Sequence, residues 1–180
     1  ELLIPDKFDI AYISQKTGKI FNYTGEGLVE ISASGMKHWF AKYLPSRLLA
    51  FQPDYDLSDN PVEGVGCQAV YDNQYDLVYF SKKDYKPIYN GLLYDYDKKR
   101  FYTLIEIVVG EPLRNYVELT NPTYFQECSF TVSYDPKTKT WISYHDWYPD
   151  LSAGLYSHFL TTKGSGMWKH NIRTDLYANY

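Results

Sequence analysis

The chain has 180 residues, of which 44% are hydrophobic and 22% are charged, and its formal net charge at pH 7 is −4. This composition is ordinary for a globular protein. The sequence has no run of five or more Lys or Arg residues, which argues against nucleic-acid binding by phosphate neutralisation, and no apolar stretch reaches the ~18 residues of a membrane helix.

Aromatic residues make up 18% of the sequence and include 20 Tyr, a content that favours β-structure. The chain begins with Glu1 and stops at Tyr180 without a tail or turn. We therefore expect residues 1–180 to be one β-rich fragment of a larger protein. The two cysteines, Cys67 and Cys128, form no CxxC motif, and we expect inward-facing thiols rather than a disulfide.

The first predicted elements are a hairpin and a short strand. Residues 8–14 and 19–23 have strand composition, and Gly18 supplies the positive φ that a turn between them needs. Residues 24–27 predict a second turn, and residues 28–32 predict a short strand.

A helical period follows, and it predicts one short amphipathic helix over about residues 34–44. Ser32 or Ser34 can cap its start, and Pro45 ends it. We expect its apolar face to lie against the sheets. Apolar residues at i, i+3, i+4, i+7 and i+8 form that face, namely Met36, Trp39, Phe40, Tyr43 and Leu44.

Three later segments repeat one pattern, in which an apolar run ends in Tyr-Asp, a polar turn follows and an aromatic strand returns. Residues 82–87 read as a charged connector between the first two copies. We take the Tyr-Asp pairs and two Trp residues as a structural turn and strand signature: Tyr71, Asp72, Tyr96, Asp97, Tyr134, Asp135, Trp141 and Trp168.

The third copy contains the clearest alternation in the chain. Cys128, Phe130, Val132 and Tyr134 share one face, which predicts a half-buried antiparallel strand over residues 128–134. Further strands are predicted over residues 141–144, 157–162 and 167–170, for a total of about eight to eleven. The copies are unevenly spaced, so we expect an all-β fold of propeller-like antiparallel hairpins, with degenerate blades.

Catalytic and metal-binding motifs are sparse. The histidines His38, His145, His158 and His170 have no metal-ligand spacing, and no nucleophile elbow, P-loop or dinucleotide motif occurs. We expect no catalytic residues and no cofactor.

A weak calcium candidate remains in the loop after the helix. Asp54 and Asp56 begin like a calcium loop and Asp59 follows, but Val65 stands where the bidentate glutamate belongs. A solvated turn is the simpler interpretation.

The turn at residues 133–141 resembles the Asp-box of sialidase propellers. It departs from that box because Lys137 replaces its glycine and Trp141 lies one position too late. The box is a structural feature, so even a true copy would not establish a glycosidase. A glycosidase needs two carboxylates across a groove, which the sequence does not pair.

The hairpins and a segment near the C-terminus together resemble a known protein family. The phrases are Ile31–Ser32 to Gly35–Met36 with Trp39–Phe40, the Tyr71–Asp72 and Tyr134–Asp135 hairpins, and Gly166-Met167-Trp168-Lys169-His170-Asn171. On these residues, the chain resembles the tail nozzle or "stabilisation" proteins of short-tailed bacteriophages, and most of all the muzzle proteins of crAss-like phages. The resemblance covers roughly residues 8–180.

The resemblance implies a virion structural protein with no catalytic residue. Proteins of this kind form a ring, usually a hexamer, with copies of themselves and with other tail proteins. The ring closes the tail channel and then lets genomic DNA through without specific binding. The expected location is the virion tail, after synthesis in the bacterial host cytoplasm. Two alternatives stay open: a carbohydrate- or receptor-binding β module, for which exposed Trp and Tyr would stack on sugar rings, and a glycosidase-type propeller.

Overall fold

The computed structural model describes residues 2–4, 8–24, 27–105, 112–155 and 158–170. Antiparallel strands dominate this part of the chain, so the all-β expectation is confirmed, while the propeller-like arrangement is not. Sixteen strands occur within these residues, more than expected, because several are only three residues long.

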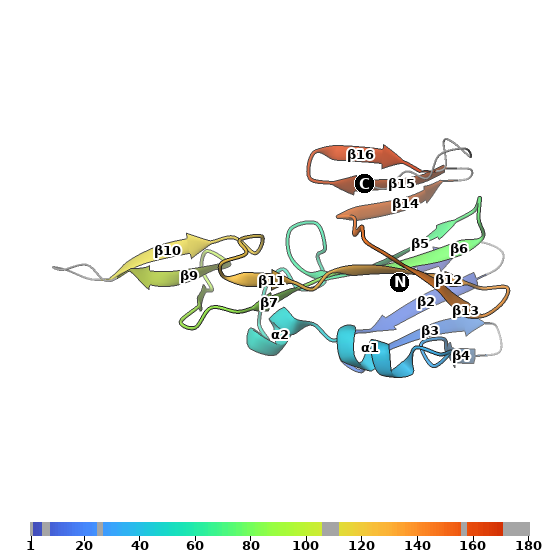
Figure 1. Cartoon of the computed structure of the whole chain (residues 1–180), viewed down its shortest axis with the longest axis horizontal. Coiled ribbons are helices and arrows are strands. Elements are labelled where there is room, and N and C mark those ends of the chain that lie inside the picture. Colours follow the sequence, from blue (N-terminus) through green and yellow to red (C-terminus); the bar gives the residue numbers. More distant parts are fainter. Residues whose placement is uncertain (1, 5–7, 25–26, 106–111, 156–157, 171–180) are drawn as a thin grey trace.

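The described residues form five sheets, and three of these sheets make up a layered body (Figure 1). The N-terminal sheet is a meander of β1 (Leu2–Ile4), β2 (Phe8–Ser14), β3 (Lys19–Thr24) and β4 (Gly27–Glu30). The central sheet has the order β13-β12-β6-β5, from β5 (Gly66–Asp72), β6 (Leu77–Lys83), β12 (Phe130–Asp135) and β13 (Thr140–His145). The C-terminal sheet contains β14 (Leu151–Leu155), β15 (His158–Lys163) and β16 (Gly166–Lys169).

The other two sheets extend away from the body. The strands β7 (Tyr85–Pro87) and β11 (Phe125–Glu127) pair with each other and continue the β6–β12 pair beyond the body. Beyond them lies a three-stranded sheet of β8 (Leu93–Asp95), β9 (Arg100–Ile105) and β10 (Leu113–Val117), which we call the arm. Figure 1 shows the arm projecting from the end of the molecule opposite the three stacked sheets.

Two short helices lie along one side of the molecule. The first, α1 (Lys37–Tyr43), lies within the predicted range but is shorter than predicted, and neither Ser32 nor Ser34 caps it, since its N-cap is Met36 without a side-chain bond. The second, α2 (Arg47–Phe51), was not predicted, because five residues carry too little periodicity. Ser46 caps α2 by accepting a hydrogen bond from the Leu49 amide at 3.1 Å.

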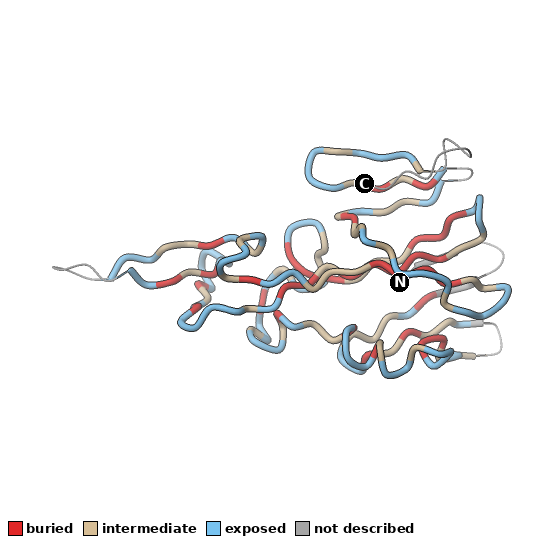
Figure 2. Tube along the Cα trace, in the orientation of Figure 1, coloured by how far each residue is buried: buried red, intermediate tan, exposed pale blue. Residues whose placement is uncertain are grey.

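The central sheet packs against other layers on both faces, while its edge strand β13 is largely exposed. On one side its residues Val78, Phe80, Val132 and Tyr134 pack with the N-terminal sheet and with Phe40 of α1. On the other side Val70 and Tyr79 pack against Phe159 of the C-terminal sheet. Figure 2 shows the buried residues concentrated along these strands.

The burial of β12 corrects the half-buried strand that alternation predicted. Thr131 and Ser133 are also buried, because their hydroxyls have internal partners: Ser81 Oγ lies 2.8 Å from Thr131 Oγ1, and His145 Nε2 lies 3.0 Å from Ser133 Oγ. The alternating pattern therefore predicts that Thr131 and Ser133 face solvent, whereas in the structure their hydroxyls form hydrogen bonds in the interior.

The predicted apolar face of α1 meets the core through most of its residues. Phe40 and Leu44 are buried, while Met36 and Trp39 are partly buried against the same core. Tyr43 is 40% exposed, so it lies at the rim, with its ring centroid 5.2 Å from that of Trp39. The apolar face of α1 that contacts the core is therefore narrower than the set of five residues predicted from the sequence.

Candidate functional site

Four hairpins share one turn geometry, and this geometry explains the repeated Tyr-Asp pattern. In each, a residue i pairs with residue i+5, and residue i+4 has positive φ. The positions i are Ser14, Asp72, Asp95 and Asp135, and the positions i+4 are Gly18, Asp76, Lys99 and Lys139.

The aspartate at position i holds the turn with its side chain. Asp135 Oδ1 accepts hydrogen bonds from the amides of Lys137 at 2.8 Å and Thr138 at 3.3 Å, and Asp72 Oδ1 accepts one from the Gln74 amide at 2.9 Å. Such bonds replace those that water would make to the turn amides. They lower the pKa of Asp135, chiefly through the Lys137 amide.

The second copy is shifted by two residues from the sequence-based assignment. Asp95, not Asp97, accepts the turn amides, and the Asp97 amide is one of its donors at 3.1 Å. Tyr96 and Asp97 are exposed, and the Tyr96 hydroxyl accepts a hydrogen bond from Gln52 Nε2 at 2.9 Å. The structural equivalents of the Tyr71–Asp72 and Tyr134–Asp135 pairs are thus Tyr94 and Asp95.

The remaining signature residues lie apart. Tyr71 and Tyr134 are buried in the body, and the Trp141 indole Nε1 donates a hydrogen bond to the Ile31 carbonyl at 3.1 Å, which ties the central sheet to the segment before α1. Trp168 lies on β16 and is 39% exposed. The signature therefore marks turns and packing, and the structure does not gather it into one site.

The calcium candidate is likewise not assembled. Within the described residues, no group of three or more His, Cys, Asp or Glu side chains is placed to hold a metal ion. Asp56 instead forms an ion pair with Lys99 at 3.3 Å, and Asp59 has φ of 62° in the turn. Both cysteines are free; burial raises the pKa of Cys67 to about 12, and Cys128 lies in the break between β11 and β12.

The least expected feature is a buried ion pair in the segment read as a charged connector. Lys82 and Asp84 have side chains 1% and 0% exposed, and Lys82 Nζ lies 2.7 Å from Asp84 Oδ2. Alternate residues of a strand point to the same side, and both side chains point inward between the sheets and the helices. We call this pair and its partners the clamp.

Each charge of the clamp has several further partners. Lys82 Nζ donates to the carbonyl of Tyr43, the last residue of α1, at 2.7 Å and to that of Pro45 just after the helix at 3.0 Å. Asp84 accepts from the Ser46 hydroxyl at 2.8 Å and from the amides of Arg47 at 2.7 Å and Leu48 at 3.3 Å. The carboxylate thereby supplies acceptors to the first turn of α2, where backbone amides lack partners.

The clamp lies where the body passes into the arm. β6 ends at Lys83 and β7 begins at Tyr85, so Asp84 interrupts the strand, while its backbone carbonyl accepts from the Cys128 amide at 2.9 Å. One buried network therefore joins both helices to the point where the sheet leaves the body. A buried pair with all its hydrogen bonds satisfied gives this junction a defined geometry.

A second charged network holds the base of the arm. The Asp95 side chain is 4% exposed, and its Oδ2 accepts from the Tyr116 hydroxyl and from Arg114 Nη1, each at 2.6 Å. These partners and the Lys98 amide lower the pKa of Asp95 to about 2, the Tyr116 hydroxyl contributing most. The same aspartate thus orders the β8–β9 turn and ties it to β10.

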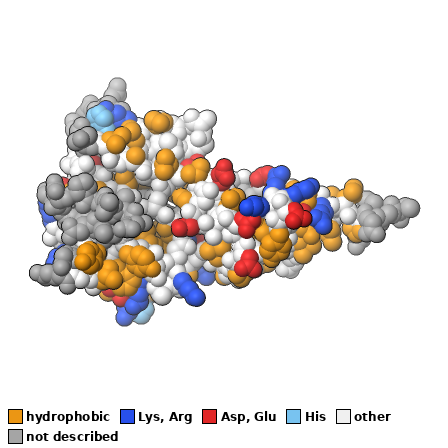
Figure 3. Space-filling view, turned by 180° about the vertical axis from the view of Figure 1, so that it is seen from behind, with side chains coloured by type: hydrophobic (Ala, Val, Ile, Leu, Met, Phe, Trp, Pro, Cys, Tyr) orange, Lys and Arg blue, Asp and Glu red, His pale blue; other side chains and the backbone are white. Residues whose placement is uncertain are grey.

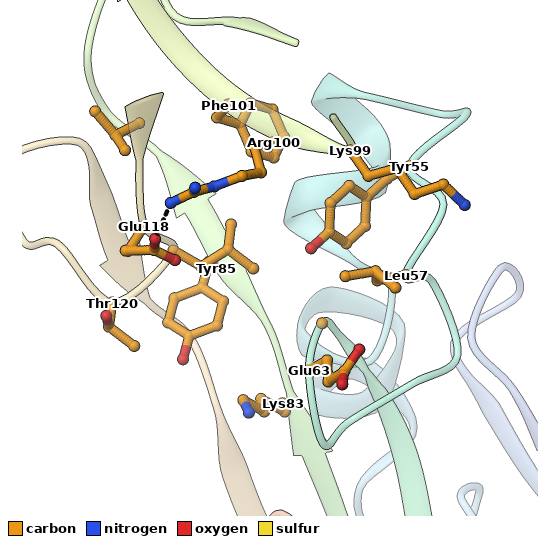
Figure 4. A pocket seen from close by; sticks show the side chains of 13 residues that line it. Tyr55, Leu57, Glu63, Lys83, Tyr85, Lys99, Arg100, Phe101, Glu118 and Thr120 are labelled. Carbon is orange, nitrogen blue, oxygen red and sulfur yellow. Dashed lines mark hydrogen bonds and ion pairs between the residues drawn. The ribbon is translucent and has the colours of Figure 1, made fainter. Parts of the chain in front are cut away.

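A pocket of about 160 Å³ separates this base from the loop after α2 (Figure 4). Tyr55 and Phe101 stack along one side with centroids 5.7 Å apart. The cations at the pocket are each paired with a carboxylate: Arg100 with Glu118, Lys83 with Asp150 and Lys99 with Asp56. Figure 4 shows Glu63 and Glu118 on opposite sides of the pocket.

The far part of the arm is apolar and exposed. Leu104, Ile105 and Leu113 are 51%, 49% and 59% exposed, and β9 and β10 pair so that Ile105 and Leu113 lie opposite each other. Leu104, the neighbour of Ile105 along β9, points to the other face of the arm. Figure 3 shows hydrophobic side chains along the projecting half of the molecule, interspersed with charged side chains of both signs.

Comparisons with known protein families, with curated proteins and with solved structures found no match for this chain. No helix in the described ranges is long and apolar enough to cross a membrane. The function must therefore be argued from the geometry and from the resemblance of the sequence phrases.

Proposed function

We propose that this chain is a structural part of a bacteriophage tail nozzle, or muzzle, that assembles as a ring with copies of itself and with other tail proteins. The observation that carries the proposal is the arm: a three-stranded sheet that projects from the body and exposes Leu104, Ile105 and Leu113. Apolar residues on both faces of a projecting sheet are typical of a surface that a neighbouring protein covers.

The rest of the molecule supports a scaffold role. The central sheet packs against other layers on both faces, and the clamp gives the junction between body and arm a defined geometry. A ring whose subunits contact each other through different surfaces needs a fixed angle between body and arm. The rotation from each subunit to the next must bring the last subunit back into contact with the first. The net charge of −4 suits a channel that DNA passes without specific binding.

In this proposal the ring is a hexamer in the virion tail, made in the host cytoplasm. It closes the channel before infection and opens it for genome ejection. The chain has no catalytic role and needs no cofactor.

The proposal is tested on intact particles from the source of the chain. Quantitative peptide mapping and native mass spectrometry are expected to find these peptides in the virion, in near six-fold ratio to single-copy tail parts. Detection only in soluble host or secreted fractions would contradict the tail assignment.

A second test addresses the arm itself. Sedimentation velocity of the isolated chain is expected to show concentration-dependent association, and Leu104→Glu with Leu113→Glu should abolish it. The matched control is Leu151→Glu, which changes an equally exposed leucine of the body, 53% exposed. A monomer at all concentrations, or association that depends on Leu151 instead, would remove the arm as the contact.

A further inference from the structure

A second cavity, of about 200 Å³, lies between the C-terminal sheet and the segment that joins β13 to β14. Its lining is of two kinds. Aromatic side chains come from Trp147 and Tyr148 on the joining segment and from Trp168 on β16, while Asp146 and Lys163 supply polar groups.

The aromatic walls are held in place before any ligand arrives. The Trp147 ring contacts those of Tyr79 and His145, with centroids 5.5 and 5.4 Å away. Lys163 Nζ lies 3.4 Å from the centre of the Tyr148 ring. Fixed walls bind more tightly than mobile ones, because little side-chain entropy is lost on binding.

Gly166 makes room for the third wall. A Cβ at this position would lie 2.3 Å from Cη2 of Trp168, so the indole occupies space that only glycine leaves free. The ring is thereby packed along its own strand, at the rim of the cavity, while remaining 39% exposed.

We propose that this cavity binds one pyranose ring of a carbohydrate. A sugar ring has C–H groups on its faces, which pack on aromatic rings, and hydroxyls at its rim, which need both donors and acceptors. Lys163 is a donor and Asp146 is an acceptor, so the polar lining matches a neutral polyhydroxylated ligand.

The size and charge of the cavity favour a small neutral ligand. Its volume is below the roughly 300 Å³ at which pockets for drug-sized ligands begin, so it accommodates a single ring rather than a nucleotide. One lysine beside one aspartate selects neither anions nor cations. This inference does not depend on the tail assignment, since a glycan site would serve a tail part and a surface module alike.

The test is titration of the full 180-residue chain with the methyl glycosides of glucose, galactose, mannose and N-acetylglucosamine. Binding is followed by saturation-transfer NMR and by tryptophan fluorescence. At least one glycoside is expected to bind saturably in the millimolar range. The variant Trp168→Ala should weaken it about threefold to tenfold, the loss expected for one aromatic contact.

The matched control is Met167→Ala, which changes the neighbouring residue on β16. Met167 is 71% exposed and points to the opposite face of the strand, so its removal should leave binding unchanged. Lys163→Ala changes the exposed last residue of β15 and gives a second weakening variant; the melting temperature of each variant is measured alongside.

Two results would overturn the proposal. The first is no saturable binding of any of the four glycosides up to about 10 mM, which corresponds to a free energy too small for a functional site. The second is binding that both Trp168→Ala and Lys163→Ala leave intact, which would place the sugar elsewhere on the chain.

Discussion

The body and the arm are stabilised in different ways. In the body, the central sheet lies between two others, and its residues contribute to two hydrophobic clusters, one on each face. In the arm, burial is confined to the base, where Phe101 and Val117 join a third cluster with α2 and the β7–β11 pair. Farther out, Leu104, Ile105 and Leu113 are exposed.

This difference shows why charged side chains are buried where the two regions meet. Hydrophobic burial is non-directional, so it can hold the layers of the body together without fixing how a projecting sheet leaves them. Hydrogen bonds to charged groups are directional. The clamp of Lys82 and Asp84 and the network around Asp95 therefore supply orientation that packing alone does not.

The largest expected effect comes from breaking the clamp. Asp84→Ala leaves the Lys82 ammonium buried without its carboxylate and removes two amide partners from the first turn of α2. The free energy of unfolding should fall by about 3–5 kcal/mol. Urea denaturation of the purified variant measures this.

Two variants make that result specific. Lys82→Met combined with Asp84→Ala should recover part of the loss, since no charge is then left buried. Asp150→Ala breaks the partly exposed pair with Lys83, 2.9 Å long, and should cost about 1 kcal/mol or less. Equal losses for Asp84→Ala and Asp150→Ala would mean that the clamp is no stronger than a surface pair.

A second prediction compares one substitution in two clusters. Phe40 and Phe101 are both buried, the first in the body and the second at the base of the arm. Each Phe→Ala change should cost about 3–5 kcal/mol. Native-state hydrogen exchange should separate them: Phe40→Ala should speed exchange throughout the central sheet, and Phe101→Ala chiefly in β8–β10.

If Phe101→Ala instead accelerates exchange in β12 as much as in β9, the body and the arm unfold as one unit. The body and the arm would then differ in geometry but not in stability.

A third prediction uses pH to weaken the base of the arm. The pKa of Asp95 is lowered in the folded chain to about 2, so its ionised form stabilises the fold above its unfolded pKa of about 3.9, and this contribution is lost as pH falls towards 2. NMR of the Tyr116 ring between pH 5 and 2 should show the arm loosening. Asp95→Asn should remove most of this pH dependence, whereas Asp97→Asn, in the exposed part of the turn, should preserve it.

The sequence predicted the elements better than the contacts between them. The first hairpin, the Tyr-Asp hairpins and α1 follow from local period and turn chemistry, which involve residues close in the chain. The clamp joins Asp84 to Ser46 and Arg47 across the fold, so no local pattern reveals it. Its one local signal is a Lys-x-Asp pair at the end of a strand, where both side chains share a face.

The second turn was misassigned for a related reason. Asp95-Tyr96-Asp97 offers two aspartates, and the Tyr-Asp pattern does not choose between them. The residue with positive φ identifies the correct aspartate, because it lies four positions after the aspartate that holds the turn in every copy. In the second copy this residue is Lys99, and a lysine does not indicate a positive φ in the sequence as Gly18 does.

The smallest predicted effect concerns these residues with positive φ. Lys139 has φ of 57° in a body hairpin and Lys99 has φ of 55° in the arm, and a left-handed conformation costs a residue with a Cβ about 1–2 kcal/mol relative to glycine. Lys139→Gly should therefore stabilise the chain by about 0.5–1 kcal/mol after the entropy that glycine adds to the unfolded state is subtracted. Lys99→Gly should gain less, because it also removes the ion pair with Asp56. Thermal unfolding of the two variants measures the difference, and Lys137→Gly is the control that should not stabilise the chain. A loss of stability in Lys139→Gly would mean that the lysine side chain itself stabilises the turn.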